Sequence, residues 1–114
     1  MPDALRQFKA ELFQALGHPV RVAIVELLVG RERSAGQLIE LLALNQANVS
    51  QHLAVLRARQ VVLTRKEGNQ VFYRLRDPVL GDVLDMLRQY FYAQFSASAA
   101  MLHQLEPSRP VPQS

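Results

Sequence analysis

The spacing of apolar side chains along the chain predicts five helices and a single pair of strands. Apolar residues recur at the period of a helix over residues 4–16, 19–29, 35–42, 46–58 and 79–104. Two stretches, Val61–Lys66 and Gln70–Leu75, are instead rich in β-forming residues, and the second alternates apolar with polar positions. Glu67-Gly68-Asn69 supplies a turn between them, so the pattern predicts a two-stranded β-hairpin. The expected fold class is mainly α, of the α+β type.

The third and fourth predicted helices form a helix-turn-helix, because their caps leave only a short link between them. Ser34-Ala35-Gly36-Gln37 matches a capping box, in which Ser34 accepts from the backbone N–H of Gln37 and Gln37 reaches back. The helix that begins there runs to about Leu42. Asn45 offers a second N-cap, so Ala43–Asn45 joins this helix to the next one.

The second helix of this pair is apolar on one face and polar, without acidic residues, on the other. Val49, Leu53 and Leu56 recur at helical spacing and predict the inward face. Residues 41–56 contain no acid, as expected of a surface that approaches DNA phosphates. Gln and Asn can bond adenine bidentately in the major groove, and Ser can contact a base edge or a phosphate. The candidates on this helix are Gln46, Asn48, Ser50 and Gln51.

Positive charge is concentrated in and just before the predicted hairpin. Residues 57–76 hold six basic residues and one acid, a net charge of +5, while the remaining chain holds seven basic and nine acidic residues. Such a local excess indicates an anionic partner, although a merely solvated face has the same composition. We expect the hairpin to contact the DNA backbone or an adjacent minor groove through Arg65, Lys66, Asn69, Gln70 and Arg74.

The last predicted helix is apolar well beyond a single stripe, which a chain of 114 residues has difficulty burying alone. Pairing with the first helix and with a second copy of the chain would bury these side chains. An intramolecular core is the alternative. The expected dimer interface consists of Leu5, Phe8, Leu12, Leu80, Val83, Leu84, Leu87, Phe91 and Phe95.

Composition restricts the remaining classes of protein. A chain with 49% apolar and 20% charged residues fits one domain over 1–105, followed by a proline-containing tail, 106–114, that we expect to be disordered. The chain has no cysteine, which excludes disulfides and thiolate metal sites. Neither a signal peptide nor a membrane span is visible, so we expect a cytoplasmic location and no membrane contact. The sequence contains no catalytic triad or phosphate loop, so we do not expect an enzyme.

Three stretches together resemble the ArsR/SmtB family of winged helix-turn-helix repressors: Leu16–Arg21, Asn48–Leu56 and Arg65–Leu75. The resemblance covers roughly residues 8–95. It implies a homodimer, joined through the first and last helices, that binds an inverted repeat in a promoter and is released by an effector. With the helix and hairpin candidates, the expected DNA-binding set is Gln46, Ala47, Asn48, Ser50, Gln51, His52, Arg57, Arg65, Lys66, Asn69, Gln70 and Arg74.

The known metal sites of that family are not preserved in this chain. Where the resemblance implies the cysteine ligands of a thiolate site, this chain has Ser34 and Gly36. Where it implies the ligands of the site on the last helix, this chain has Asp77, Val79, Tyr90 and Ala93, so only the acid is kept. Zinc needs three or four ligands, so we expect no metal and no cofactor. His18 and His52 are expected to be structural or close to DNA. His103 and Glu106 form at most a fragment of a site.

The sequence is compatible with two hypotheses about the signal that the protein senses. An apolar or aromatic effector held by Tyr90, Phe91, Tyr92 and Phe95 is one hypothesis, although such stripes are usually core. The other is that no small molecule acts, and that a protein partner or the protein's own level controls it. A winged-helix module that binds protein, without a specific DNA target, is the alternative function.

Overall fold

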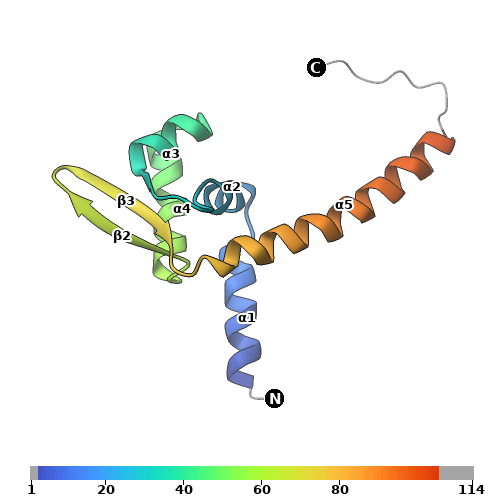
Figure 1. Cartoon of the computed structure of the whole chain (residues 1–114), viewed down its shortest axis with the longest axis horizontal. Coiled ribbons are helices and arrows are strands. Elements are labelled where there is room, and N and C mark those ends of the chain that lie inside the picture. Colours follow the sequence, from blue (N-terminus) through green and yellow to red (C-terminus); the bar gives the residue numbers. More distant parts are fainter. Residues whose placement is uncertain (1–2, 106–114) are drawn as a thin grey trace. The chain divides into compact units, whose positions relative to one another are not determined.

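The structure, a computed structural model, describes residues 3–105, with side chains as far as Met101. The predicted tail 106–114 and the side chains of His103 and Glu106 lie outside the described residues. Within the described range the elements are α1 (Asp3–Ala15), α2 (Pro19–Leu27), β1 (Arg33–Ser34), α3 (Ala35–Leu42), α4 (Gln46–Ala58), β2 (Val62–Glu67), β3 (Gln70–Leu75) and α5 (Val79–Leu105) (Figure 1). The five predicted helices are thus confirmed.

Caps set where three of these helices begin. The Nδ1 atom of His18 accepts from the backbone N–H of Val20 at 3.1 Å, and Pro19 occupies the first turn of α2. Ser34 and Gln37 form both hydrogen bonds of the predicted capping box, at 3.1 and 2.9 Å. The side chain of Asn45 accepts from the N–H of Asn48 at 2.7 Å and so starts α4.

The end of α4 explains why β2 begins one residue later than the sequence pattern predicts. The N–H of Val61 donates to the carbonyl of Leu56 and the N–H of Gln60 to that of Arg57, both at 2.9 Å. These two bonds form a Schellman motif, with Gln60 in the left-handed region at φ 57°. Because the N–H of Val61 completes the helix end, the strand starts at Val62.

The sheet is antiparallel with the strand order β1–β3–β2, and its third strand was not predicted. The sequence pattern predicts a loop at Arg33, but Arg33 and Ser34 pair with Tyr73 and Phe72. The hairpin register pairs Glu67 with Gln70, so the connecting turn has only two residues and not the predicted three. In Figure 1 the β2–β3 hairpin projects from the helices as a wing.

The chain divides into two parts, one up to Gly81 and the other from Asp82 onward. The core of the first part is formed by apolar residues of α1–α4, of the sheet and of the positions next to them, which are at most 8% exposed: Ala15, Ile24, Val25, Leu28, Leu38, Val49, Leu53, Leu56, Val61, Val62 and Leu75. In this part α4 packs against α2, α3 and β2. The inward face predicted for this helix is confirmed, because Val49, Leu53 and Leu56 all belong to the core.

The second part is formed by the rest of α5. Many of its apolar side chains are exposed, Phe95 most of all at 75%. No helix in the described range is long and apolar enough to cross a membrane.

Candidate nucleic-acid interface

The face of α4 opposite the core is polar and solvent-exposed. Five of the predicted DNA-binding residues on this helix are exposed and two are half-buried, Asn48 and His52; the exposed ones are Gln46, Ala47, Ser50, Gln51 and Arg57. Because Val49, Leu53 and Leu56 are buried in the core, they fix the direction in which this face points. A rigid helix with an acid-free, amide-bearing face has the side chains that major-groove recognition requires.

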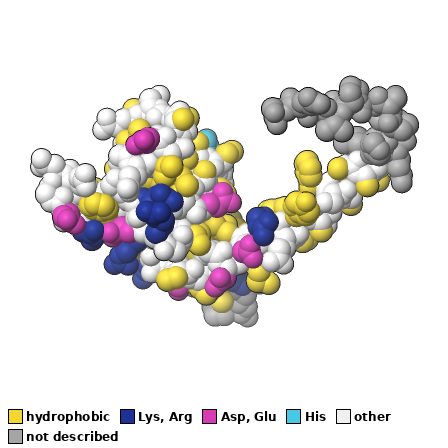
Figure 2. All heavy atoms as spheres, turned by 45° about the horizontal axis from the view of Figure 1, so that its top comes forward, with side chains coloured by type: hydrophobic (Ala, Val, Ile, Leu, Met, Phe, Trp, Pro, Cys, Tyr) yellow, Lys and Arg dark blue, Asp and Glu magenta, His cyan; other side chains and the backbone are white. Residues whose placement is uncertain are grey.

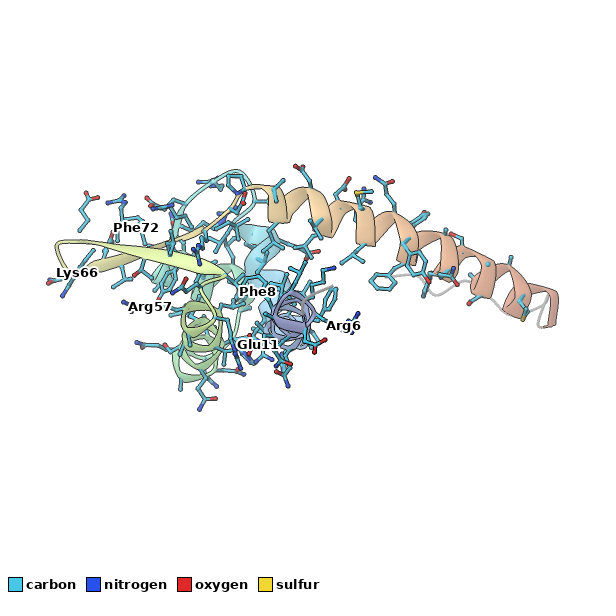
Figure 3. The ribbon with its side chains drawn as sticks, turned by 90° about the horizontal axis from the view of Figure 1, so that it is seen from below. Arg6, Phe8, Glu11, Arg57, Lys66 and Phe72 are labelled. Carbon is cyan, nitrogen blue, oxygen red and sulfur yellow. The ribbon has the colours of Figure 1, made fainter. Side chains whose placement is uncertain are left out.

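An open groove separates this face of α4 from the wing. It has a volume of about 410 Å³ and is lined by Ser50, Leu53, Ala54, Arg57, Ala58 and Tyr73. All but Tyr73 come from α4, while Tyr73 belongs to β3 and pairs with Thr64 of β2. Figure 3 shows Arg57 leaving α4 on the side of the hairpin. The groove therefore brings two predicted DNA-binding residues, Ser50 and Arg57, together with a tyrosine that the sequence did not single out.

The wing carries its predicted polar and basic residues on the surface. Lys66, Asn69, Gln70 and Arg74 are all exposed. Lys66 lies near the tip of the hairpin (Figure 3). In Figure 2 the basic side chains over the hairpin are interspersed with acidic ones, so the wing is not a uniformly positive surface.

Arg65 is held by two carboxylates, unlike its basic neighbours on the wing. Its Nη2 atom lies 2.7 Å from Oε1 of Glu32, its Nε atom lies 2.9 Å from both oxygens of Glu32, and its Nη1 atom lies 2.5 Å from Glu67. Its Cζ atom lies 4.4 Å from the centre of the Phe72 ring, its cross-strand partner. The hydrogen bond from Arg65 is the main reason that the pKa of Glu32 is lowered, and Glu32 and Glu67 raise the pKa of Arg65. Arg65 is thus bound by two carboxylates of the same chain, although it lies at the surface.

His52 contacts α2 and does not project freely from α4. Its ring lies 4.2 Å from that of His18, and its Nδ1 atom lies 3.4 Å from Nη1 of Arg21. Arg21 also donates to the carbonyls of Ala15 at 2.6 Å and Gln14 at 3.3 Å. Burial is the main cause of a lowered pKa at His52, and His18 and Arg21 add to it. This cluster links the end of α1, the start of α2 and the middle of α4.

The residues expected at the dimer interface are largely uncovered. On α1, Leu5 and Phe8 are 49% and 63% exposed, and Leu12 is half-buried. On α5, exposed positions alternate with half-buried ones: Val83, Phe91 and Phe95 are exposed, and Leu80, Leu84 and Leu87 are half-buried. Tyr90 and Tyr92, considered for an effector, are also exposed. Both helices therefore present apolar side chains that no part of the described chain covers fully.

Two of the positions that correspond to metal ligands in the family, Ser34 and Asp77, bond backbone N–H groups at helix starts. Ser34 caps α3, and Oδ1 of Asp77 accepts from the backbone N–H of Val79 at 3.0 Å, at the start of α5. Among the described residues, no three His, Asp or Glu side chains are grouped so that they could hold a metal ion. His18, as shown above, caps α2.

Three contributors to this surface were not predicted from the sequence. Glu32 lies in the loop before β1 and is separated from Arg65 by 33 positions, so no local pattern connects them. For Tyr73 the alternating pattern predicts a strand position and no contact with DNA. Arg76 contributes only to the net charge of the basic stretch in the sequence, whereas in the structure its guanidinium donates to the side chain of Gln60.

Comparison with known proteins agrees with this geometry. The sequence family described as "Bacterial regulatory protein, arsR family" matches residues 18–62. A Mycobacterium tuberculosis protein, the HTH-type transcriptional regulator Rv0081, is 38% identical over 104 residues, which are 90% of this chain and 91% of that protein. The biofilm growth-associated repressor of Xylella fastidiosa is 39% identical over 85 residues, 75% of each chain.

Two solved structures of bacterial transcriptional regulators are also similar to this chain. The crystal structure of M. tuberculosis Rv0081 has a TM-score of 0.75, with 38% identity, and covers 83% of this chain and 96% of its own. The crystal structure of the transcriptional repressor BigR from Xylella fastidiosa has a TM-score of 0.71, with 35% identity over 78% of this chain and 91% of its own.

Proposed function

The chain belongs to the ArsR family and is a DNA-binding transcriptional repressor, and from this premise we propose that two copies bind an inverted-repeat operator. The observation that carries this proposal is the exposed, acid-free face of α4 beside the wing. Gln46, Asn48 and Gln51 read base edges in the major groove in this proposal. Phosphates are contacted by Ser50 and Arg57 of α4 and by the basic residues of the wing that form no ion pair there, Lys66 and Arg74.

A homodimer accounts for the exposed apolar residues of α1 and α5. Burying a side chain such as Phe8, Phe91 or Phe95 stabilises an assembly by roughly 1.5–3 kcal/mol each. A twofold dimer places two copies of α4 in successive major grooves about 34–36 Å apart. Its operator is then an inverted repeat, since each half-site meets an identical protomer.

Release from the operator is assigned to a signal other than a metal ion. Ser34 and Asp77, the positions that resemble ligands, already bond backbone N–H groups of α3 and α5. The two hypotheses from the sequence both stand here. One is an apolar or aromatic molecule near Tyr90, Phe91, Tyr92 and Phe95. The other is control by a protein partner or by the protein's own level.

Fluorescence anisotropy tests the proposal, with labelled DNA from upstream of the protein's own gene and a scrambled duplex as control. The titrations are repeated at several salt concentrations, because non-specific phosphate contacts weaken steeply with salt. We expect tight binding of the native fragment that survives moderate salt and exceeds that of the scrambled duplex. Light scattering of the complex gives its stoichiometry, for which we expect two chains per operator.

Two results would contradict the proposal. Equal and steeply salt-sensitive binding of both duplexes would leave only non-specific contacts at this site. The absence of binding to either duplex would favour the protein-binding module instead.

A further inference from the structure

The first helix is attached to the rest of the protein mainly at its C-terminal end. Residues 3–10 of α1 are all exposed, and Ala15 is the one buried residue that the structure describes in this helix. In Figure 1 α1 extends away from α2 and α4. Because a helix takes its direction from what it contacts, the direction of α1 depends on the few contacts of its last turns.

An arginine of α2 binds the last turn of α1. The Nε atom of Arg21 donates to the carbonyl of Ala15 at 2.6 Å, and its Nη2 atom donates to the carbonyl of Gln14 at 3.3 Å. The last carbonyls of a helix lack partners within it and form the negative end of its dipole, which a cation stabilises. Since α1 has no basic residue in its own last turn, the next helix supplies that cation.

The same guanidinium contacts the middle of α4. Nη1 of Arg21 lies 3.4 Å from Nδ1 of His52, and both side chains are half-buried. A guanidinium has only donors, so Nδ1 accepts here and the ring of His52 is neutral, in agreement with its lowered pKa. The ring of His18, which caps α2, lies 4.2 Å from the ring of His52. Arg21 therefore joins the end of α1 to α4 through a single side chain.

A second and more exposed contact joins the same two helices. Oε1 of Glu11 on α1 lies 3.4 Å from Nη1 of Arg59, the residue that caps the C-terminal end of α4. Figure 3 shows Glu11 on the side of α1 that faces α4. Exposed ion pairs stabilise a structure only weakly, so Arg21 is the stronger of the two links.

We propose that Arg21 is a positioning residue for operator recognition: it sets the angle between α1 and α4, and with it the spacing of half-sites that the protein accepts. The inference rests on the proposed function, in which α1 contributes to the dimer interface and α4 reads the bases. Any change in the angle between the two helices then displaces α4 from its half-site. Each added base pair moves the second half-site by about 3.4 Å and turns it by roughly 35°, so a loosely held α1 widens the range of accepted spacings.

Fluorescence anisotropy with a series of operators tests this inference. The half-sites that footprinting locates in the upstream fragment are kept, and the spacing between them is native or is lengthened or shortened by one or two base pairs. A duplex with a single half-site is measured as well. Light scattering gives the mass of each variant, and its melting temperature shows that it is folded.

Arg21→Gln is the test variant, and Arg33→Gln is its matched control. The Nε atom of Arg33 also donates at 2.6 Å to the last residue of a helix, the carbonyl of Leu27 in α2. Both variants lose one charge and one bond to a helix end, but within the described residues Arg33 hydrogen-bonds neither α1 nor α4. Arg21→Lys is the milder variant, because it keeps the charge and lacks the planar fork that reaches several acceptors.

We expect the wild type and Arg33→Gln to bind the native spacing roughly ten-fold more tightly than an altered one, the loss expected when a displaced α4 gives up a base contact. In Arg21→Gln this preference falls to about three-fold or less, because the loosened dimer fits several spacings. Arg21→Lys and Glu11→Gln reduce the preference to a smaller extent. Binding of the single half-site is the same in Arg21→Gln and Arg33→Gln, since α4 itself is unchanged.

The inference alone is overturned if a wild type with a preferred spacing is matched by folded Arg21→Gln and Arg21→Lys variants with the same preference. It is also overturned if Arg21→Gln loses the single half-site as strongly as the full operator, because a distorted α4 has that effect. Failure of the proposed function is visible in the wild type. If the wild type binds no operator, or binds every spacing equally, both the inverted-repeat dimer and the positioning role of Arg21 are wrong.

Discussion

Arg65 on the wing and Glu32 in the loop before β1 form a bidentate ion pair, although they are separated by 33 positions in the sequence. The pair joins β2 to the loop that precedes the helix-turn-helix. It also reduces the charge that Arg65 can offer to DNA. The prediction that Arg65 contacts a phosphate therefore depends on whether DNA can displace these carboxylates.

Glu32→Gln is expected to strengthen DNA binding and to steepen its salt dependence by about one phosphate contact. The substitution removes one of the two carboxylates on Arg65, so only Glu67 still competes with the DNA backbone for its guanidinium. Anisotropy titrations against the scrambled duplex measure the effect. Glu26→Gln, an exposed position on α2, makes the same charge change away from the wing. Equal behaviour of the two variants would show that Arg65 stays out of reach of DNA.

Gln51→Ala is expected to reduce discrimination between operator and scrambled DNA by about 1–3 kcal/mol if its contact with a base is bidentate. Lys66→Ala should instead weaken both duplexes similarly and lower the salt slope by about one, since a phosphate contact carries no sequence information. Gln14→Ala, exposed on α1, is the matched control. If the Gln51 and Lys66 variants changed both affinities and the salt slope in the same way, Gln51 would not be a base contact distinct from the phosphate contact of Lys66.

Leu87→Arg is expected to separate the proposed dimer, because a charged side chain would enter the proposed apolar interface. Tight operator binding should be lost with it, since each half-site alone binds weakly. Size-exclusion chromatography with light scattering gives the mass, and anisotropy gives the affinity. Ser96→Arg, at an exposed position on the same helix, is the control. A monomeric Leu87→Arg variant that keeps full affinity would contradict the dimer proposal.

The cluster of His52 with His18 and Arg21 should make folding sensitive to mildly acidic pH. The pKa of His52 is lowered from 6.5, so the unfolded chain binds a proton more readily than the folded chain does. The free energy of unfolding is therefore unaffected well above pH 6.5 and falls as the pH drops below it. Urea unfolding at about pH 7.5 and pH 5.5 measures this dependence. His52→Gln should make the free energies of unfolding at the two pH values more alike. If their difference is unchanged in this variant, a group other than His52 causes the pH dependence.

Ala43→Gly is expected to raise the free energy of unfolding by roughly 0.5–1 kcal/mol. Ala43 ends α3 with φ 55°, where a Cβ atom is strained and glycine is not. Ala10→Gly, at an exposed position inside α1, should be destabilising by a similar amount, since glycine there only loses helix propensity. Urea unfolding compares both with the wild type. A loss of stability in Ala43→Gly would mean that the turn gains more from the methyl group than the strain costs.

Local patterns in the sequence determined the elements and most of the candidate surface. The capping box at Ser34, the N-cap at Asn45 and the apolar spacing of Val49, Leu53 and Leu56 all depend on neighbours a few positions apart. Because these relations involve only residues close together in the sequence, the sequence predicts the bounds of α4 and the polar face that it exposes. The basic stretch located the wing in the same way.

Tertiary structure decided the relations between distant segments. The pairing of β1 with β3, the ion pair of Glu32 with Arg65 and the contact of His52 with Arg21 join residues more than 30 positions apart. Each depends on how the helices pack, because a side chain finds its partner only after the chain has brought the two together. Charge counting treated Arg57, Arg65, Arg74 and Arg76 as equivalent cations. Only the folded chain distinguishes Arg65, which two carboxylates neutralise, from the other three, which form no ion pair within the described residues.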